Sequence, residues 1–155
     1  MANTYSQLYI HFVFAVENRL SLISEEWEEE LFKYISGILK GKNQKPIAVN
    51  GMPDHMHVLA GLRPTMSCSD IMQIVKGESS KWINSRGFIQ GIFKWQSGFG
   101  AFSCSRGHLD HVYQYVMNQK NAHKTKSFRM EYLDLLEELE IPFDSRYIFH
   151  DSYSK

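Results

Sequence analysis

Hydrophobic residues near the N-terminus alternate along the chain with a period of two. One side of residues 4–16 carries Leu8, Ile10, Phe12, Phe14 and Val16, and the other side carries Tyr9, Val13 and Ala15. Successive side chains of a β-strand point to opposite faces, so both faces of this segment are apolar. The pattern predicts a central strand over residues 4–16 that is covered on both sides.

The next hydrophobic residues recur every three to four positions. This stripe consists of Trp27, Leu31, Tyr34, Ile35 and Ile38. Such spacing marks one face of an α-helix. Ser24 precedes the stripe as an N-cap and Gly41 follows it, which predicts a helix over residues 24–40. The acidic residues 28–30 are expected on the solvated side of this helix.

The remaining elements are predicted from turn and capping residues. Residues 46–50 and 55–61 form two strands, because the segment 51–54 between them contains Gly, Pro and Asp. Ser67 and Asp70 form a capping pattern that opens a helix ending near Arg86. Further predictions are short strands over 93–95 and 99–105, a helix over 107–122, and a last helix over 127–139 that buries Tyr132, Leu135, Leu136 and Leu139.

This order of strand, helix, strand, strand, helix and strand is the split βαβ pattern. It predicts an α+β fold of the ferredoxin-like or RRM-like type. We expect an antiparallel sheet with helices mainly on one face, and appended C-terminal helices. No repeat or linker interrupts the pattern, so residues 1–155 are expected to form a single domain.

Composition limits the possible functions only loosely. The chain has 155 residues, of which 43% are hydrophobic, and a formal net charge of zero. No run reaches the ~18–20 apolar residues that a membrane span requires. The two cysteines have no metal-ligand spacing, and no basic segment precedes residues 8–16 as in a signal peptide. We therefore expect a cytoplasmic protein with no membrane partner. The neutral charge by itself does not predict binding to nucleic acid.

Four residues in two short motifs carry candidate chemistry. His55 and His57 share one face of a predicted strand, and Tyr115 and Gln119 are neighbours on a predicted helix. Together they offer two imidazole nitrogens and an amide oxygen as metal ligands, next to a phenol that could act as a nucleophile. A divalent cation would stabilise a phosphodiester under attack, and this mixed donor set suits Mg²⁺ or Mn²⁺.

Each motif also has a simpler interpretation. A histidine in a strand is more often a hydrogen-bonded structural residue than a ligand. A tyrosine beside the apolar stripe of a helix is equally typical of an amphipathic boundary position. Asp54 could orient a metal-binding histidine, although its position favours the role of a turn residue.

The two motifs together resemble those of the HUH single-tyrosine transposases of small insertion sequences and their repeat-associated relatives. The resemblance extends over nearly the whole chain, in family order, through residues 10–14, 53–58, 75–84, 95–103, 115–119, 127–132 and 144–147. Two positions depart from the family pattern, since Glu17 replaces a usual Lys and Phe99 a common Tyr.

The resemblance implies roles for the four residues. His55, His57 and Gln119 would bind the divalent metal, and Tyr115 would attack single-stranded DNA to give a 5′-phosphotyrosine link and a free 3′-hydroxyl, without ATP. A hydroxyl could then attack the link and rejoin the DNA. Family members are dimers that recognise hairpins near the ends of insertion sequences, so hairpin DNA and a second copy of the chain are the expected partners.

Basic residues interleaved with aromatic ones suggest where DNA would bind. The candidates are Arg19, Lys76, Lys81, Arg86 and Lys120. Two other functions stay open. A non-catalytic module that binds single-stranded nucleic acid would not need the four site residues. A metal-dependent phosphodiesterase that uses water would cut DNA without a covalent intermediate.

Overall fold

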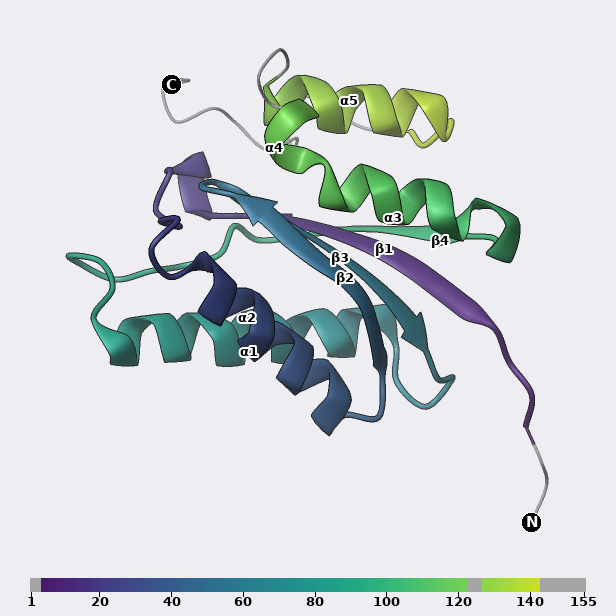
Figure 1. Cartoon of the computed structure of the whole chain (residues 1–155), viewed down its shortest axis with the longest axis horizontal. Coiled ribbons are helices and arrows are strands. Elements are labelled where there is room, and N and C mark those ends of the chain that lie inside the picture. The colour runs from purple at the N-terminus through teal and green to yellow at the C-terminus, as the bar shows by residue number, and fades with distance from the viewer. Residues whose placement is uncertain (1–3, 123–126, 143–155) are drawn as a thin grey trace.

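The computed structural model describes residues 4–122 and 127–142, and their strands form one antiparallel sheet. The strands are β1 (Leu8–Ala15), β2 (Lys45–Met52), β3 (His55–Leu62) and β4 (Gly100–Cys104), in the spatial order β2-β3-β1-β4 (Figure 1). Neighbouring strands are antiparallel throughout. This order is that of the ferredoxin-like split βαβ unit, so the predicted fold class is confirmed.

Helices cover both faces of the sheet. The two helices that connect the strands of the sheet, α1 (Glu28–Gly41) and α2 (Cys68–Arg86), lie on one face (Figure 1). The appended helices α3 (Leu109–Met117), α4 (Gln119–Ala122) and α5 (Phe128–Glu138) lie on the opposite face. Short 3₁₀ turns at Glu17–Arg19 and Arg106–His108 follow β1 and precede α3. The space between the sheet and the appended helices holds the candidate site.

Strand β1 is covered on both sides, as its sequence predicts. Phe12 and Phe14 are fully buried in the larger core, where they pack with the buried residues of α1 and α2. Val13 and Ala15 are fully buried in a smaller core with residues of α5. Because β1 lies between β3 and β4, both of its edges are also hydrogen-bonded to neighbouring strands.

The first helix begins later than predicted. Ser24 does cap a turn, since its hydroxyl oxygen accepts from the backbone N–H of Glu26 at 3.1 Å, but the helix starts at Glu28. Trp27 has φ −131° and ψ 3°, which is not helical, and its ring stacks on Phe88 at a centroid distance of 4.7 Å. The expectation that residues 28–30 are solvated is wrong for Glu28, which is buried.

The segment 93–95 forms no strand, which corrects the prediction. The side chain of Asn84 occupies both backbone groups of Phe93, accepting from its N–H at 2.7 Å and donating to its carbonyl at 3.1 Å. Only an isolated bridge between Val16 and Trp95 remains. Two backbone hydrogen bonds, from Glu17 to Lys94 at 3.0 Å and from Gln96 to Ala15 at 2.7 Å, form this bridge, and the side chain of Asn84 holds Phe93 in place of a longer ladder.

The helix predicted over 107–122 is broken at Asn118. Asn118 has φ −97° and ψ 18°, and separates α3 from the single turn of α4. The amide of Asn50 on β2 donates to the carbonyls of Val116 and Met117, at 3.0 and 3.3 Å. These carbonyls end the last turn of α3, so Asn50 acts as its C-terminal cap.

The other helix ends follow the expected capping chemistry. Ser67 accepts from the N–H of Asp70 at 3.0 Å, and Gly87 ends α2 with φ +66°, which glycine adopts at low cost. In α5, Tyr132 and Leu136 are buried as predicted, whereas Leu139 follows the helix and is 43% exposed. No helix within residues 4–122 and 127–142 has the length and apolar character to cross a membrane.

Candidate functional site

The two histidines of the first motif stand at the start of β3. His55 pairs with Ala15 and His57 with Val13 of β1, and both imidazoles are fully buried. Being two residues apart, they share the sheet face that α3, α4 and α5 cover. The hairpin that precedes them is tight, because a side chain at Gly51 would lie 2.6 Å from the carbonyl oxygen of His55.

Tyr115 and Gln119 approach these histidines from the helical layer. The Tyr115 ring meets the His57 ring edge-on at a centroid distance of 5.7 Å. Gln119 is buried, its Oε1 lies 3.3 Å from Nε2 of His55, and its amide nitrogen donates to the carbonyl of Tyr115 at 3.3 Å. The four residues of the two motifs therefore converge, although a helix break separates the second pair.

A chain of charged contacts orients His55 from behind. Arg19 is buried and its Nη2 lies 2.6 Å from Oδ2 of Asp54, whose Oδ1 accepts from Nδ1 of His55 at 2.7 Å. Burial alone would raise the pKa of Asp54, but the bonds and charges of His55 and Arg19 lower it to about 2. The His55 ring also stacks on Phe128 of α5 at 3.9 Å. Asp54 is thus both the turn residue and the partner of His55.

These contacts decide which nitrogen of His55 faces the site. An ionised carboxylate can only accept a hydrogen bond, so Nδ1 of His55 carries a proton and Nε2 is the nitrogen that faces the site. The amide nitrogen of Gln119 is used by Tyr115, so its oxygen is the atom directed at Nε2. Nε2 of a neutral His55 and this amide oxygen, 3.3 Å apart, would both be ligands for a cation placed beside them.

His57 is held between two further groups that the sequence motifs do not contain. Nδ1 of His57 lies 2.8 Å from Nε2 of His11 on β1, and Nε2 of His57 lies 3.1 Å from Oε1 of Glu131 on α5. His11 is 4% exposed, and burial together with the charge of His57 lowers the pKa of His11 to about 3. A neutral His11 can accept the Nδ1 proton of His57, so Nε2 is the nitrogen of His57 that faces Glu131 and would meet a metal ion.

Glu131 also contacts the candidate nucleophile. The Tyr115 phenol donates a hydrogen bond to the Glu131 carboxylate. Burial, followed by the charge and hydrogen bond of Glu131, raises the pKa of Tyr115 far above its ordinary value. The phenol is therefore protonated at neutral pH and has an anionic proton acceptor beside it.

A cleft connects Tyr115 to solvent. It has a volume of about 590 Å³ and lies between β4, α3 and α5, where Tyr115, His11 and Glu131 form its inner end. The outer part is lined by Phe102, His108, His111, Asp134 and Leu139, among others. A substrate could reach the phenol through this cleft without rearrangement of the sheet.

The donor set fits a divalent cation. Ligand atoms of His55, His57 and Glu131 all lie within 4.8 Å of one another, and the oxygen of Gln119 adjoins His55. Two imidazoles with a carboxylate and an amide oxygen form a mixed nitrogen and oxygen set, which suits Mn²⁺ well and Mg²⁺ less strongly. Each histidine has a partner on its other nitrogen, as metal-bound histidines usually do.

Glu131 and His11 are the residues that the motifs missed, and both left a signal in the sequence. The apolar stripe of α5 includes Phe128, Tyr132 and Leu135, and Glu131 occupies the position within this stripe where an apolar residue is expected. His11 is the polar residue in an otherwise apolar strand. A charged or polar residue at a core position indicates a functional or paired group.

Four of the five residues predicted to bind DNA have partners within the protein. Arg19 pairs with Asp54, and Arg86 pairs with Glu30 at 3.2 Å and lies over the Trp82 and Phe88 rings. The Lys76 ammonium donates to the carbonyls of Gln96 and Gly98, at 2.6 and 2.9 Å. Lys120 pairs with the buried Glu28.

Lys81 differs from these four because it is exposed on α2. DNA binding by all five residues stays a prediction. The block at 144–147 lies outside the described residues.

One comparison with known proteins identifies a family, and another finds similar folds. A model of the IS200-like transposases matches residues 4–119. A proposed transposase from Deinococcus radiodurans R1 has a similar structure, with a TM-score of 0.60, 21% identity, and coverage of 77% of this chain and 95% of that one. A REP-associated tyrosine transposase bound to a REP hairpin has a TM-score of 0.59, 18% identity, and coverage of 79% and 73%. No curated protein matches the sequence.

Proposed function

Because this chain belongs to the IS200-like transposase family, we propose that it cleaves and rejoins single-stranded DNA through a covalent phosphotyrosine intermediate. The observation that carries the proposal is the contact of one carboxylate, Glu131, with both the Tyr115 phenol and Nε2 of His57. A nucleophile, a proton acceptor and a set of metal ligands thus meet at the end of one cleft.

Tyr115 supplies the nucleophile. The phenol oxygen attacks the phosphorus of a phosphodiester, and the phenol proton passes to the Glu131 carboxylate. The bond from phosphorus to the 3′ oxygen breaks, and that oxygen takes a proton from water. The products are a 5′-phosphotyrosine link and a free 3′-hydroxyl. Because the link keeps the energy of the original phosphodiester, a hydroxyl that attacks it rejoins DNA without ATP.

The remaining residues position the reacting groups. We propose that His55, His57 and Gln119 bind Mg²⁺ or Mn²⁺, with Glu131 as a further ligand. The cation would act as a Lewis acid on the phosphate oxygens. Asp54 and His11 hold the protons on the outer nitrogens of the two histidines, so that both inner nitrogens face the same point.

The partners follow from the family and from one relative. The REP-associated relative is bound to a hairpin, and we propose hairpin DNA as the substrate of this chain as well. We also propose a homodimer and a single domain over residues 1–155. The experiment that tests the proposed function is the formation of a protein–DNA adduct that survives denaturation, with single-stranded DNA and Mg²⁺ or Mn²⁺. A water-using phosphodiesterase would cut the same DNA and give no adduct.

A further inference from the structure

Several exposed cations at the other end of the sheet have no partner of their own. Lys33, Lys40, Lys45 and Arg63 are exposed, and their side chains form no ion pair or hydrogen bond with other described residues. This contrasts with Arg19, Lys76, Arg86 and Lys120, which are all held by intramolecular contacts. The exposed cations of the described chain therefore include a group that the sequence did not suggest, in addition to Lys81.

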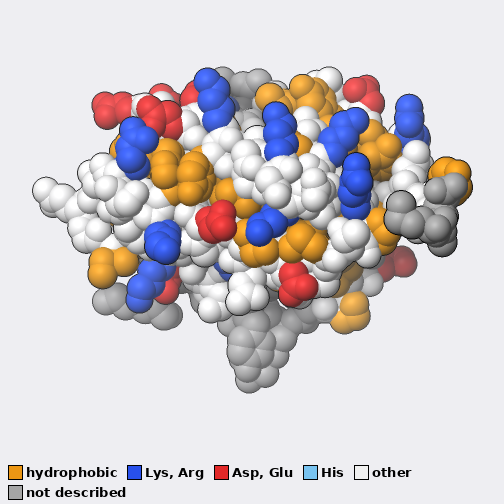
Figure 2. All heavy atoms as spheres, turned by 90° about the horizontal axis from the view of Figure 1, so that it is seen from below, with side chains coloured by type: hydrophobic (Ala, Val, Ile, Leu, Met, Phe, Trp, Pro, Cys, Tyr) orange, Lys and Arg blue, Asp and Glu red, His pale blue; other side chains and the backbone are white. Residues whose placement is uncertain are grey.

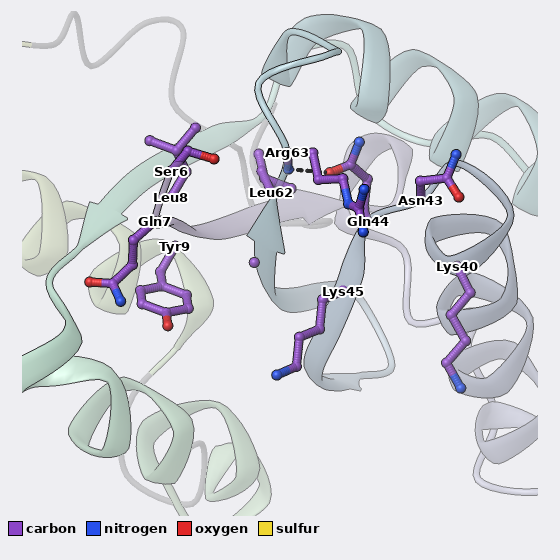
Figure 3. A pocket seen from close by; sticks show the side chains of 11 residues that line it. Ser6, Gln7, Leu8, Tyr9, Lys40, Asn43, Gln44, Lys45, Leu62 and Arg63 are labelled. Carbon is purple, nitrogen blue, oxygen red and sulfur yellow. Dashed lines mark hydrogen bonds between the residues drawn. The ribbon is translucent and has the colours of Figure 1, made fainter. Parts of the chain in front are cut away.

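These four cations line two adjoining hollows. The first has a volume of about 410 Å³, lies where β1, β2 and β3 meet the end of α1, and includes Lys40, Lys45 and Arg63 (Figure 3). The second, of about 390 Å³, includes Lys33 and shares Lys40 with the first. Among their described lining residues there is no Asp or Glu, in a protein with seventeen of each charge sign. We call these two hollows the basic groove.

A hydrogen bond to a buried side chain joins two walls of the basic groove. Gln44 is buried, and its side-chain oxygen accepts from the N–H of Arg63 at 2.7 Å, which ties the start of β2 to the end of β3 (Figure 3). Lys33 and Lys40 are seven residues apart on α1, which places them two turns and roughly 10.5 Å apart on one side. The C-terminal dipole of α1 favours Lys40, but it accounts for neither Lys45 nor Arg63.

The chemistry of the basic groove fits phosphates better than bases. Single strands are usually held by rows of exposed aromatic rings on which bases stack. Here the aromatic residues of the lining are the half-buried Tyr9 and the buried Phe32, so no stacking surface is present among the described lining residues. Lysines and an arginine without acidic neighbours instead match the regularly spaced phosphates of a duplex backbone. Elsewhere on the face formed by α1 and α2, cations are scattered among hydrophobic and acidic side chains (Figure 2).

The basic groove is within reach of DNA bound at Tyr115. Gly61 in the groove and His57 in the site lie on the same strand, four residues and roughly 13 Å apart. That distance corresponds to roughly four base-pair steps along a duplex axis.

We propose that the basic groove binds the phosphate backbone of a DNA duplex, the stem of a hairpin whose single-stranded flank reaches Tyr115. This inference rests on the proposed function for the flank, whereas the binding of the stem can be measured without catalysis.

The test compares two charge-matched variants. One is Lys40→Ala/Lys45→Ala, and the control is Lys94→Ala/Arg106→Ala, at two cations that line neither the basic groove nor the cleft at Tyr115. All of these side chains are exposed, so the variants are expected to fold with the thermal unfolding midpoint of the parent. Fluorescence anisotropy measures the affinity of each protein for a labelled DNA hairpin with a single-stranded tail, and for the tail alone, over a series of salt concentrations.

We expect the groove variant to bind the hairpin more weakly, with a salt dependence (log Kd against log salt) reduced by roughly 2. The tail alone and the control variant should behave as the parent does. Unchanged hairpin binding, or an equal loss for the tail alone, would overturn the inference.

Adduct formation separates this inference from the proposed function. At saturating DNA the groove variant should still form the Tyr115 adduct, because no groove residue contacts the phenol. If the parent protein forms no adduct on any DNA while the groove variant still loses hairpin affinity, the proposed function is wrong. The inference that the basic groove binds the hairpin stem is then still supported.

Discussion

Oε1 of Glu131 lies 3.1 Å from Nε2 of His57, and the same carboxylate accepts the hydrogen bond of the Tyr115 phenol. Glu131 comes from α5, His57 from β3 and Tyr115 from α3, so three separate elements meet at one carboxylate. The appended helix α5 is therefore part of the candidate site and not merely a cover for the sheet.

The first prediction concerns metal affinity. Glu131→Ala should weaken Mn²⁺ binding by about 10- to 100-fold, because it removes a ligand or the partner that orients His57. Isothermal titration with Mn²⁺ measures this directly. Asp134→Ala, one turn further along α5 and exposed, is the matched control and should bind Mn²⁺ as the parent does. Equal affinities for the parent and Glu131→Ala would remove Glu131 from the metal site.

The second prediction concerns Asp54 and acid stability. The pKa of Asp54 is lowered in the folded protein to about 2, from an ordinary value of 3.8, so folding stabilises the ionised form. This contribution, about 2 kcal/mol, is present above roughly pH 4 and is lost as the pH falls toward 2. Urea unfolding should show Asp54→Asn to be less stable than the parent at pH 7, with a difference that shrinks below pH 4. A difference that does not depend on pH would contradict the assignment.

The third prediction concerns His11, which acts in a higher pH range. Its pKa is lowered from 6.5 to about 3, so the unfolded chain binds a proton below pH 6.5 that the folded protein does not. The free energy of unfolding should therefore decrease as the pH falls from 6.5 to 3. His11→Gln cannot take up this proton, so its stability should depend less on pH between 6.5 and 4. A parent curve that is flat in this range would show that His11 is protonated in the folded protein.

The fourth prediction separates a structural lysine from a DNA-binding one. Lys76 is half-buried, and its ammonium satisfies the carbonyls of Gln96 and Gly98. Lys76→Met should lower the free energy of unfolding by about 1–3 kcal/mol, because two carbonyls lose their donor. Hairpin affinity, measured by anisotropy on the folded variant, should stay at the parent value. A variant that is as stable as the parent but binds DNA more weakly would instead support the prediction that Lys76 contacts DNA.

Much of the fold could be predicted because local patterns and tertiary packing agree. The alternation along β1 and the cap at Ser67 are satisfied in the structure as the sequence indicates. The failures arise where a distant side chain competes for backbone groups. Asn84 takes the hydrogen bonds that would make 93–95 a strand, and Asn50 ends α3 at Asn118. Neither contact is visible in the local sequence, because each partner comes from another element.

In the candidate site too, the features set by local sequence could be predicted and those set by distant elements could not. His55 and His57 share a face because strand periodicity requires it, and Gln119 stays beside Tyr115 because its amide bonds to the Tyr115 carbonyl across the break. The contact of Glu131 with His57 could not be predicted from the sequence, since the position of Glu131 depends on how α5 packs over β1 and β3. Its place within an apolar stripe was the available signal. The cations of Arg19, Arg86 and Lys120 could not be distinguished from free ones until their carboxylate partners were known.

The central claim is that Tyr115 forms a covalent bond to DNA, and one comparison tests it most directly. The parent protein and Tyr115→Phe are incubated with single-stranded DNA from the flanks of the gene, with Mg²⁺ or Mn²⁺, and resolved on a denaturing gel. We predict a protein–DNA band for the parent that is absent for Tyr115→Phe, although both proteins bind the DNA equally well. A band that persists in Tyr115→Phe, or DNA cleavage by both proteins without any such band, would contradict the account.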